Sequence, residues 1–393
     1  MMPFIPYGKH HVDSSDIEAV VDILENKFLT QGPTIEAFEN TIADYVGAKY
    51  AVAVSSGTAA LHLCALAAGI ELGRVLITTP VTFVASANAA LYAGGQVAFA
   101  DIDPASINMS PDRLAEIVSD NTGTQAVVPV HFAGLPCDMP AIEKAAAQTG
   151  AVIIEDASHA LGSLYPDGKR VGCCASSDMT VFSFHPVKAI AAGEGGMITT
   201  NDEKIYRQLI RLRSHGINKL DDKFQLPEQS GSNGVQYPWY YEMQELGFNY
   251  RITDIQCALA LSQFKKLDRF VARRRELVRN YDAVFSEMEF CRPAQLKGIE
   301  QSSHHLYVLR IDFDGANTNR EELMLQLREK NIGTQVHYIP IPVQPYYQRL
   351  GFKPDDYTNA QAYYREALSI PLYYDLTDEQ QQYVIMAIQD LLS

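Results

Sequence analysis

Positive charge is scarce in this sequence. Its 393 residues include 32 Lys and Arg against 47 Asp and Glu, which leaves a formal net charge of -15. Nucleic acids and anionic membrane surfaces attract clustered Lys and Arg, so the balance argues against both as partners. A small anionic substrate stays compatible with it, because helix N-termini and backbone amides bind anions locally.

Long hydrophobic runs and paired cysteines are also missing. No stretch approaches the roughly 20 consecutive apolar residues that a membrane-spanning helix needs. Residues 1–16 contain no basic segment followed by an apolar one, so the sequence predicts no signal peptide. The six cysteines include no CxxC pair, and the adjacent Cys173 and Cys174 are expected to be small packing residues. A cytoplasmic protein is the simplest expectation.

Short β-rich runs alternate with Ala- and Leu-rich stretches between residues 49 and 201. Seven such runs occur, from YAVAVSS at residue 50 to GMITTND at residue 196. This alternation is typical of a mainly parallel sheet with helices on both faces. We therefore expect an α/β fold with a mainly parallel seven-stranded sheet, and functional groups at the carboxyl ends of its strands.

The composition changes after Arg213. Residues 214–250 are polar and aromatic, which indicates a long loop at a functional site or an interface. A helical pattern follows over residues 253–285, then strand-like residues 304–313 and 332–341, and helix-like residues 319–331 and 377–393. We expect a large domain over residues 1–250 and a smaller α+β domain over residues 251–393.

The segment SSGTAALHLCALAAG, residues 55–69, predicts a strand that ends directly at a helix N-terminus. The free amides there, together with Ser56, Gly57 and Thr58, would suit a phosphate group. An ordinary Ser/Thr N-cap explains the same residues, and taken alone it is the commoner case.

Two further segments carry chemistry-bearing residues. In AVIIEDASHALGS, an apolar strand delivers Asp156 and His159 at its carboxyl end, where the carboxylate either keeps a pyridine nitrogen protonated or caps the next turn. In SFHPVKAIAAGEGG, Lys188 follows Ser183 and His185. A desolvated lysine has a lowered pKa and is nucleophilic, whereas a solvated surface lysine is the more frequent situation.

The order of these segments favours one interpretation. A phosphate cradle, a strand-end carboxylate and a lysine, about 100 and then about 30 residues apart, are the parts of a pyridoxal 5'-phosphate site. Lys188 would form the covalent Schiff base, and Asp156 would keep the ring nitrogen protonated so that the ring accepts carbanion electrons. Phe83 either stacks on the ring or is a plain core residue.

The same residues resemble a known family. The motifs LTQGPTIEAFE, SSGTAAL, PVTFVASANA, EDASHALGS, SFHPVK, GEGGMITTND, RSHG, NYRITDIQCALALSQ and QVHYIPI cover nearly the whole chain. They are similar to the DegT/DnrJ/EryC1/StrS sugar-nucleotide aminotransferases, which are fold-type I enzymes dependent on pyridoxal phosphate. Within that family the chain looks most like the branch that makes UDP-4-amino-4,6-dideoxy-N-acetyl-β-L-altrosamine on the way to pseudaminic acid.

The resemblance implies roles for individual residues. Lys188 would carry the cofactor and shuttle the proton, Asp156 would pair with the ring nitrogen, and His159 would lie near the ring's 3-oxygen. Ser56, Gly57, Thr58 and Ser183 would hold the phosphate. Asn249 would reach the phosphate in the neighbouring subunit, which implies a homodimer with a shared active site. The implied contacts to the UDP-sugar are Tyr7, Lys27, Phe28, Leu29, Thr30, His185, Gln335, Val336, His337 and Tyr338, with Lys27 and His337 offering positive charge or donors to the diphosphate.

The implied reaction moves an amino group from L-glutamate to C4 of a UDP-4-keto-6-deoxy-N-acetylhexosamine. Alternatives are the same chemistry on a UDP-4-keto-pentose or a bacillosamine precursor, a sugar dehydratase of the same fold, and a non-catalytic regulator. Lys188 favours transamination, because some of the dehydratases carry histidine in its place. Two features depart from the common family pattern, namely His159, where many members have glutamine, and the length of the 214–250 loop.

Three charged or imidazole-bearing groups have plainer explanations. The pairs His10–His11 and His304–His305 lack a third ligand at metal-binding spacing, so we expect surface or strand residues. The run RRRELVR that begins at Arg273 is expected to be a solvated helix face.

Overall fold

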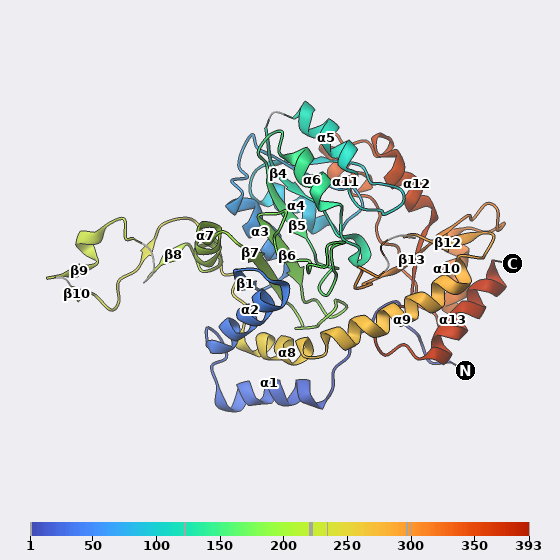
Figure 1. The fold of residues 1–393 in the computed structure, drawn as a ribbon, viewed down its shortest axis with the longest axis horizontal. Coiled ribbons are helices and arrows are strands. Elements are labelled where there is room, and N and C mark those ends of the chain that lie inside the picture. The colour runs from blue at the N-terminus through green and yellow to red at the C-terminus, as the bar shows by residue number, and fades with distance from the viewer. Residues whose placement is uncertain are drawn as a thin grey trace.

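The computed structural model describes residues 2–121, 123–219, 223–233, 235–295, 298 and 300–392. Its largest element is a seven-stranded sheet in the order β1-β7-β6-β5-β4-β2-β3 (Figure 1). The strands are β1 (Tyr50–Val54), β2 (Val75–Thr78), β3 (Gln96–Phe99), β4 (Thr124–Val128), β5 (Val152–Asp156), β6 (Met179–Ser183) and β7 (Gly196–Thr200). All pairings are parallel except those of β7, which runs antiparallel to β1 and β6. The expected mainly parallel sheet is confirmed.

Helices cover both faces of this sheet. On one face, α3 (Gly57–Ala67), α4 (Val84–Tyr92) and α7 (Glu203–Arg213) share a buried cluster with the strands. On the other face lie α2 (Pro33–Val46), α5 (Pro111–Asp120), α6 (Met139–Ala146) and α8 (Asp254–Phe264). Helix α1 (Ser14–Asn26) packs on the outer side of α8 (Figure 1). Because the sheet is buried on both faces, its strands are almost continuously apolar.

The C-terminal part of the chain builds a smaller layer. Strands β12 (Cys291–Pro293), β13 (Tyr307–Ile311) and β14 (Ala367–Ile370) form an antiparallel sheet. Helices α9 (Leu267–Phe285), α10 (Arg320–Glu329) and α13 (Asp378–Leu391) cover it, and the short α11 (Pro345–Arg349) and α12 (Thr358–Glu366) precede β14. Within the described residues, 3-10 turns lie at Phe132–Gly134, Pro227–Gln229, Ile341–Val343 and Pro354–Asp356.

Two segments cross the boundary that the sequence suggests at residue 250. Ile5, near the N-terminus, is fully buried in the core of the smaller layer. Cys257 and Leu267, beyond residue 250, belong to the core on the large sheet. A division of the chain into domains 1–250 and 251–393 stays a proposal.

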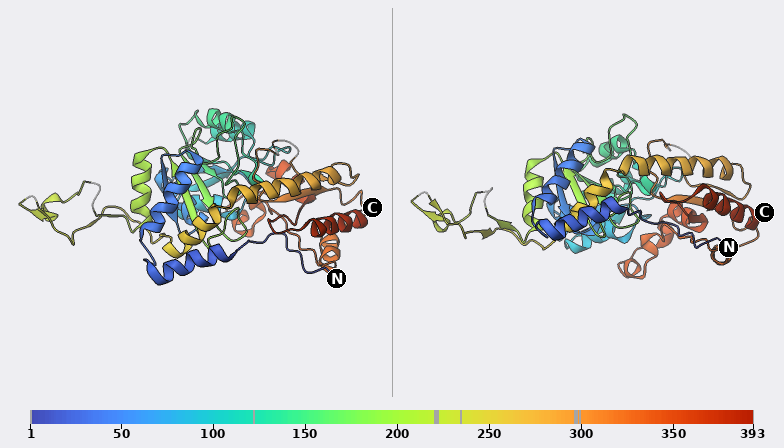
Figure 2. Two further views of the ribbon diagram at one scale, coloured as in Figure 1. Left: turned by 60° about the horizontal axis from the view of Figure 1, so that its bottom comes forward. Right: turned by 90° about the horizontal axis from the view of Figure 1, so that it is seen from below.

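Phe248 and Tyr250 pack against the core on the large sheet. The short strands earlier in residues 214–250 extend from the body as an arm (Figures 1 and 2). Its described parts contain the paired strands β8 (Ile217–Asn218) with β11 (Glu242–Met243), and β9 (Gly231–Ser232) with β10 (Val235–Gln236); residues 220–222 and 234 lie outside the described residues. The Glu242 carboxylate accepts hydrogen bonds from the backbone amides of Gln225 and Leu226, at 2.6 and 2.9 Å. The arm therefore has internal structure.

Two sequence predictions about the second half are wrong. The helix expected over residues 253–285 is divided, because α8 ends at Phe264 and α9 begins at Leu267. The strand expected over residues 332–341 is reduced to two isolated bridges, one between Ile332 and Ile5 and one between Gln335 and Ser369. At its centre the carbonyl of His337 accepts a hydrogen bond from the Tyr363 hydroxyl at 2.6 Å, so a side chain takes the place of a strand partner.

No helix in the described part of the chain combines the length and the hydropathy that crossing a bilayer requires.

Candidate active site

A cavity of about 400 Å³ opens at the carboxyl ends of β1, β5 and β6, between the large sheet and the C-terminal layer. It brings together residues that are widely separated in the sequence. The predicted site residues in its wall are Tyr7, Ser56, Gly57, Thr58, Phe83, Asp156, His159, Ser183, His185, Lys188, His337 and Tyr338.

The remaining predicted site residues do not line this cavity, and all but the partly buried Val336 are exposed. They are Lys27, Phe28, Leu29, Thr30, Asn249, Gln335 and Val336. Lys27 pairs with Asp22 at 2.5 Å and faces a different groove, between α1 and α8. Phe28 and Leu29 are 69% and 49% exposed. Within one chain, these residues therefore contact neither the cavity nor its contents.

The N-terminus of α3 forms one end of the cavity. Ser56 is the N-cap, and its hydroxyl accepts a hydrogen bond from the backbone amide of Ala59 at 3.1 Å. The cap leaves the amides of Gly57 and Thr58 without intrahelical acceptors, at the positive end of the helix dipole. A Cβ on Gly57 would lie 3.0 Å from Cβ of Ser183, so glycine allows the helix start and β6 to approach closely. The N-cap interpretation is thus confirmed, and it leaves donors free for an anion.

Asp156, the last residue of β5, is buried in the wall of the same cavity. Its Oδ2 accepts a 2.6 Å hydrogen bond from the Ser86 hydroxyl, and its Oδ1 accepts from the backbone amide of Ser158 at 3.1 Å. Thr82 lies 2.9 Å from Ser86, oxygen to oxygen. Ser86 was not identified from the sequence, although it follows Phe83 at helical spacing in α4 and so faces the same side.

Lys188 lies in the loop that joins β6 to β7. The neck of this loop is closed by two 2.9 Å hydrogen bonds, from the Phe184 amide to the Gly195 carbonyl and from the Ala192 amide to the Phe184 carbonyl. Burial lowers the pKa of the Lys188 amine to about 8, although the nearby Asp156 carboxylate acts in the opposite direction. Among the described residues, the amine has no hydrogen-bond or ion-pair partner. It is therefore an accessible nucleophile with a substantial neutral fraction near pH 8.

His159 contacts two aromatic side chains in the cavity wall. Its Nε2 lies 3.1 Å from the Tyr338 hydroxyl, and its ring centroid lies 4.3 Å from that of His305. Burial, followed by the positive charge of Lys188, holds the pKa of His159 well below its usual value. The imidazole is therefore neutral at physiological pH.

Phe83 and Tyr338 provide the aromatic walls. Phe83 is 58% exposed and lines the cavity, so the plain core interpretation of this residue is wrong. Its ring centroid lies 6.4 Å from that of Tyr338. A planar ligand entering the cavity would meet an exposed aromatic face here.

His337 does not supply the positive charge expected from the sequence. Burial and the nearby Lys188 amine lower its pKa to about 4, so the ring is neutral at pH 7. Its Nδ1 lies 2.8 Å from the Ser369 hydroxyl, which leaves Nε2 as the one ring nitrogen able to contact a ligand.

Two plain interpretations from the sequence are also wrong. His304 and His305 are each 7% exposed, and His305 lines the cavity instead of lying on a surface or strand. In the basic run of α9, Arg274 is buried at 5% exposure and donates to the carbonyls of His304, His305 and Leu372. The sequence contains little indication that Arg274 is buried, because a buried arginine and a solvated arginine look alike in sequence.

The donor set of the cavity fits pyridoxal phosphate. Free amides at a helix start suit the phosphate, and a buried carboxylate anchored by Ser86 suits the ring nitrogen. The Lys188 amine, which no described residue pairs with, suits the aldehyde. Cys173 and Cys174 are buried free thiols, as expected. No cluster of three or more potential metal ligands occurs among the described residues.

Comparisons with known proteins agree with this geometry. A profile of the DegT/DnrJ/EryC1/StrS aminotransferase family matches residues 10–389. The spore coat polysaccharide biosynthesis protein SpsC of Bacillus subtilis is 39% identical over 99% of this chain and 97% of its own. The UDP-4-amino-4,6-dideoxy-N-acetyl-beta-L-altrosamine transaminase of Campylobacter jejuni is 37% identical over 97% of this chain and 95% of its own.

Solved structures are similar over the whole chain. Helicobacter pylori PseC, an aminotransferase involved in the biosynthesis of pseudaminic acid, superposes with a TM-score of 0.88 at 30% identity, covering 99% of both chains. The PLP (pyridoxal phosphate) form of Spr1654 from Streptococcus pneumoniae, named a putative sugar aminotransferase, superposes with a TM-score of 0.87 at 26% identity, covering 99% of this chain and 98% of its own. The fold is that of fold-type I pyridoxal phosphate enzymes.

Proposed function

Because the chain belongs to the DegT/DnrJ/EryC1/StrS aminotransferase family, we propose that it transfers an amino group from L-glutamate to C4 of a UDP-4-keto-6-deoxy-N-acetylhexosamine. The product would be UDP-4-amino-4,6-dideoxy-N-acetyl-β-L-altrosamine, an intermediate in pseudaminic acid biosynthesis. The names of the Campylobacter jejuni relative and of PseC support this substrate.

One observation carries the proposal. Lys188, an amine with no partner among the described residues, shares a cavity with the Asp156 carboxylate and the open helix start at Gly57. This combination supports transamination over dehydration, because transamination needs a group that moves the α-proton, and the Lys188 amine is such a group.

Bound pyridoxal phosphate would supply an electron sink for the carbanion formed at the amino-bearing carbon. The residues of the chain would do the rest. Gly57, Thr58 and Ser183 would hold the phosphate, and Asp156, fixed by Ser86, would stabilise the positive charge on the ring nitrogen. With its pKa of about 8, the Lys188 amine both accepts and donates a proton near neutral pH.

The substrate residues of the proposal fall into two groups. Tyr7, His185, His337 and Tyr338 line the cavity and would contact the sugar or its diphosphate. His337 would act there as a neutral donor through Nε2. Lys27, Phe28, Leu29, Thr30, Gln335 and Val336 lie outside the cavity of their own chain, so their role would depend on an assembled protein.

We propose a homodimer in which each subunit completes the other's site. Asn249, the proposed partner-side phosphate ligand, is exposed and lies outside the cavity of its own chain. It adjoins the arm, whose Trp239, Tyr241, Met243 and Leu246 are 71%, 56%, 61% and 75% exposed. Apolar exposure on that scale is typical of an interface.

A product analysis tests the proposed function. The purified protein is loaded with pyridoxal phosphate and incubated with L-glutamate and a panel of UDP-4-keto sugars. 2-Oxoglutarate should appear with the 4-keto-6-deoxy-N-acetylhexosamine, and NMR of the product should place the nitrogen at C4 with the L-altro configuration. A deoxygenated sugar, or no 2-oxoglutarate, would exclude transamination.

The similarity to SpsC favours one second candidate. That relative is named for spore coat polysaccharide biosynthesis, so the same transfer onto another nucleotide-linked 4-keto sugar would serve a different surface polymer. The same panel decides between the two, because the preferred substrate is the one with the highest kcat/KM.

A further inference from the structure

We propose that His305 is a positioning residue for this reaction, which packs against His159, fixes the plane of that ring and keeps water from its Nδ1. The inference rests on the proposed function, because His159 matters only if the cavity holds the cofactor beside it. Nothing in the sequence distinguished His305 from an ordinary strand histidine.

The contact between the two imidazoles is close and buried. Their ring centroids lie 4.3 Å apart with an interplanar angle of 37°, and each residue is 7% exposed. Nδ1 of His159 and Nδ1 of His305 are both buried without a hydrogen-bond partner among the described residues. On the other side of the ring, Nε2 of His159 lies beside the Tyr338 hydroxyl. Because no described residue bonds to Nδ1, a hydrogen bond restrains the ring on the Nε2 side alone. Ring packing from His305 supplies the missing restraint.

The backbone that carries His305 is held from several directions. Arg274, from α9, donates through Nη1 to the carbonyls of His304, His305 and Leu372, at 3.2, 3.3 and 3.0 Å. The His305 amide donates to the Ala133 carbonyl at 2.9 Å. A residue with this many backbone restraints offers its side chain in one place, as a positioning role requires.

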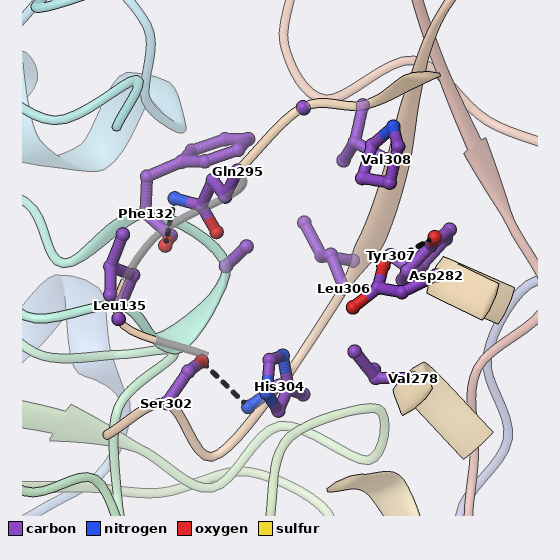
Figure 3. Close-up of a pocket in the computed structure, with 14 residues that line it drawn as sticks. Phe132, Leu135, Val278, Asp282, Gln295, Ser302, His304, Leu306, Tyr307 and Val308 are labelled. Atoms are coloured by element: carbon purple, nitrogen blue, oxygen red, sulfur yellow. Dashed lines mark hydrogen bonds between the residues drawn. The ribbon is translucent and has the colours of Figure 1, made fainter. Parts of the chain in front are cut away.

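The turn before His305 is fixed in the same way (Figure 3). The amide of His304 donates to the Ser302 hydroxyl at 3.0 Å, beside a separate cavity of about 20 Å³ whose wall includes Phe132 and Tyr307. That volume is enough for about one water molecule. Figure 3 shows His304 on this side of the chain, so the two histidines face different cavities, and only His305 belongs to the active-site wall.

The charges around the pair explain why dryness matters. Burial has the largest effect on both rings. Lys188 and then His337 also disfavour a proton on His159, and His159, Lys188, Arg274 and His337, in that order, do the same for His305. The Asp156 carboxylate lies in the same wall, and the Tyr338 hydroxyl is uncharged. If His305 were shortened to alanine, water would reach Nδ1 of His159, and the pKa of His159 would return toward its ordinary value of about 6.5.

The experiment follows the protonation of His159 directly. Holoenzyme with ring-13C-labelled histidine is titrated by NMR from pH 8 to pH 5 in the wild type and in the variants His305→Ala and His305→Phe. The His159 signal is assigned by its loss in His159→Gln. His62→Ala is the matched control, since His62 is a buried histidine with a ring 4.8 Å from Phe248, outside the cavity wall.

The expected results separate positioning from folding. His159 should not titrate in the wild type, in His305→Phe or in His62→Ala, because the ring packing is intact. In His305→Ala it should titrate with a midpoint near 6 to 6.5, and an acid limb with that midpoint should appear in the pH profile of kcat. Adding His159→Gln to His305→Ala should remove the limb.

Two outcomes would overturn the inference. One is a wild-type His159 that titrates near pH 6.5, a measurement that needs no variant to fold. The other is a folded His305→Ala protein in which His159 stays neutral to pH 5. Failure of the proposed function would be seen in a different measurement. The wild-type protein would then lack the visible absorbance of lysine-bound pyridoxal phosphate.

Discussion

The hydroxyl of Ser86, on α4, donates a 2.6 Å hydrogen bond to Oδ2 of Asp156 at the end of β5. The carboxylate therefore keeps its orientation through a group from a neighbouring helix. Thr82 lies 2.9 Å from the same hydroxyl and continues the network.

Ser86→Ala should weaken cofactor binding without unfolding the protein. A hydrogen bond to a charged group contributes about 1.5 to 3 kcal/mol, so the Kd for pyridoxal phosphate should rise roughly tenfold or more. Equilibrium dialysis of the cofactor measures the change, with the exposed Ser119→Ala as the control. An unchanged Kd would mean that Asp156 does not need this anchor.

Lys188→Met should stabilise the cofactor-free protein at pH 7. The pKa of Lys188 is about 8 in the folded state and 10.5 ordinarily, so folding penalises the charged amine at every pH below about 8. At about 1.4 kcal/mol per pKa unit, the penalty at pH 7 is roughly 3 to 3.5 kcal/mol. Above the folded pKa the penalty declines, because the folded state has already lost its proton.

Denaturant unfolding at two pH values checks the direction of this pH dependence of stability. The stability difference between Lys188→Met and the wild type should be larger at pH 7 than at pH 9.5. A stability difference that grows with pH would contradict the assignment of Lys188 as a buried amine with a lowered pKa. The variant should also lose the visible absorbance and all transaminase activity.

Mixing two inactive variants tests the shared site. In a mixed dimer of Lys188→Ala and Asn249→Ala, one site would have both residues intact if Asn249 acts across the interface. Co-expressed and doubly tagged mixed dimers should then recover about half the wild-type activity, while each variant alone stays impaired. Mixed dimers no more active than their parents would place Asn249 outside the partner's site.

His337 should contribute no charge to substrate binding. Its pKa of about 4 keeps the ring neutral throughout the physiological range. The KM for the UDP-sugar is measured between about pH 5.5 and 8 in the wild type and in His337→Gln. No inflection near pH 6.5 should be present in the wild type and absent from the variant. An inflection of that kind would show that substrate binding brings a proton onto the ring.

The sequence predicted the sheet well because periodicity is a local property. Each of the seven β-rich runs became a strand, and the glycine and serine residues near Gly57 coincided with the start of a helix. The prediction of a single helix failed because the local sequence does not mark where one helix ends and the next begins. Lys265 and Lys266 separate α8 from α9 without a proline or glycine, so the helical pattern runs straight through the break.

The site was predictable to the same extent. Lys188 and Asp156 have sequence neighbours that limit what they do, and the structure places both in one cavity. Ser86, Arg274 and His305 act through partners at least 30 residues away in the chain, such as the 70-residue separation between Ser86 and Asp156. One sequence without a fold holds no information about which of many serines or arginines meets such a partner.

The antiparallel position of β7 has a consequence for synthesis of the chain. β1 is an edge strand, and β7 is its neighbour in the sheet, so β1 is unpaired from the moment Val54 leaves the ribosome until Thr200 follows. The pairing is strongly non-local and slow to form, while the buried residues Val52, Ala53 and Val54 stay exposed on the nascent polypeptide. Unpaired apolar strands of this kind aggregate readily, so the emerging N-terminal half is the stretch where a chaperone would act on this protein during translation.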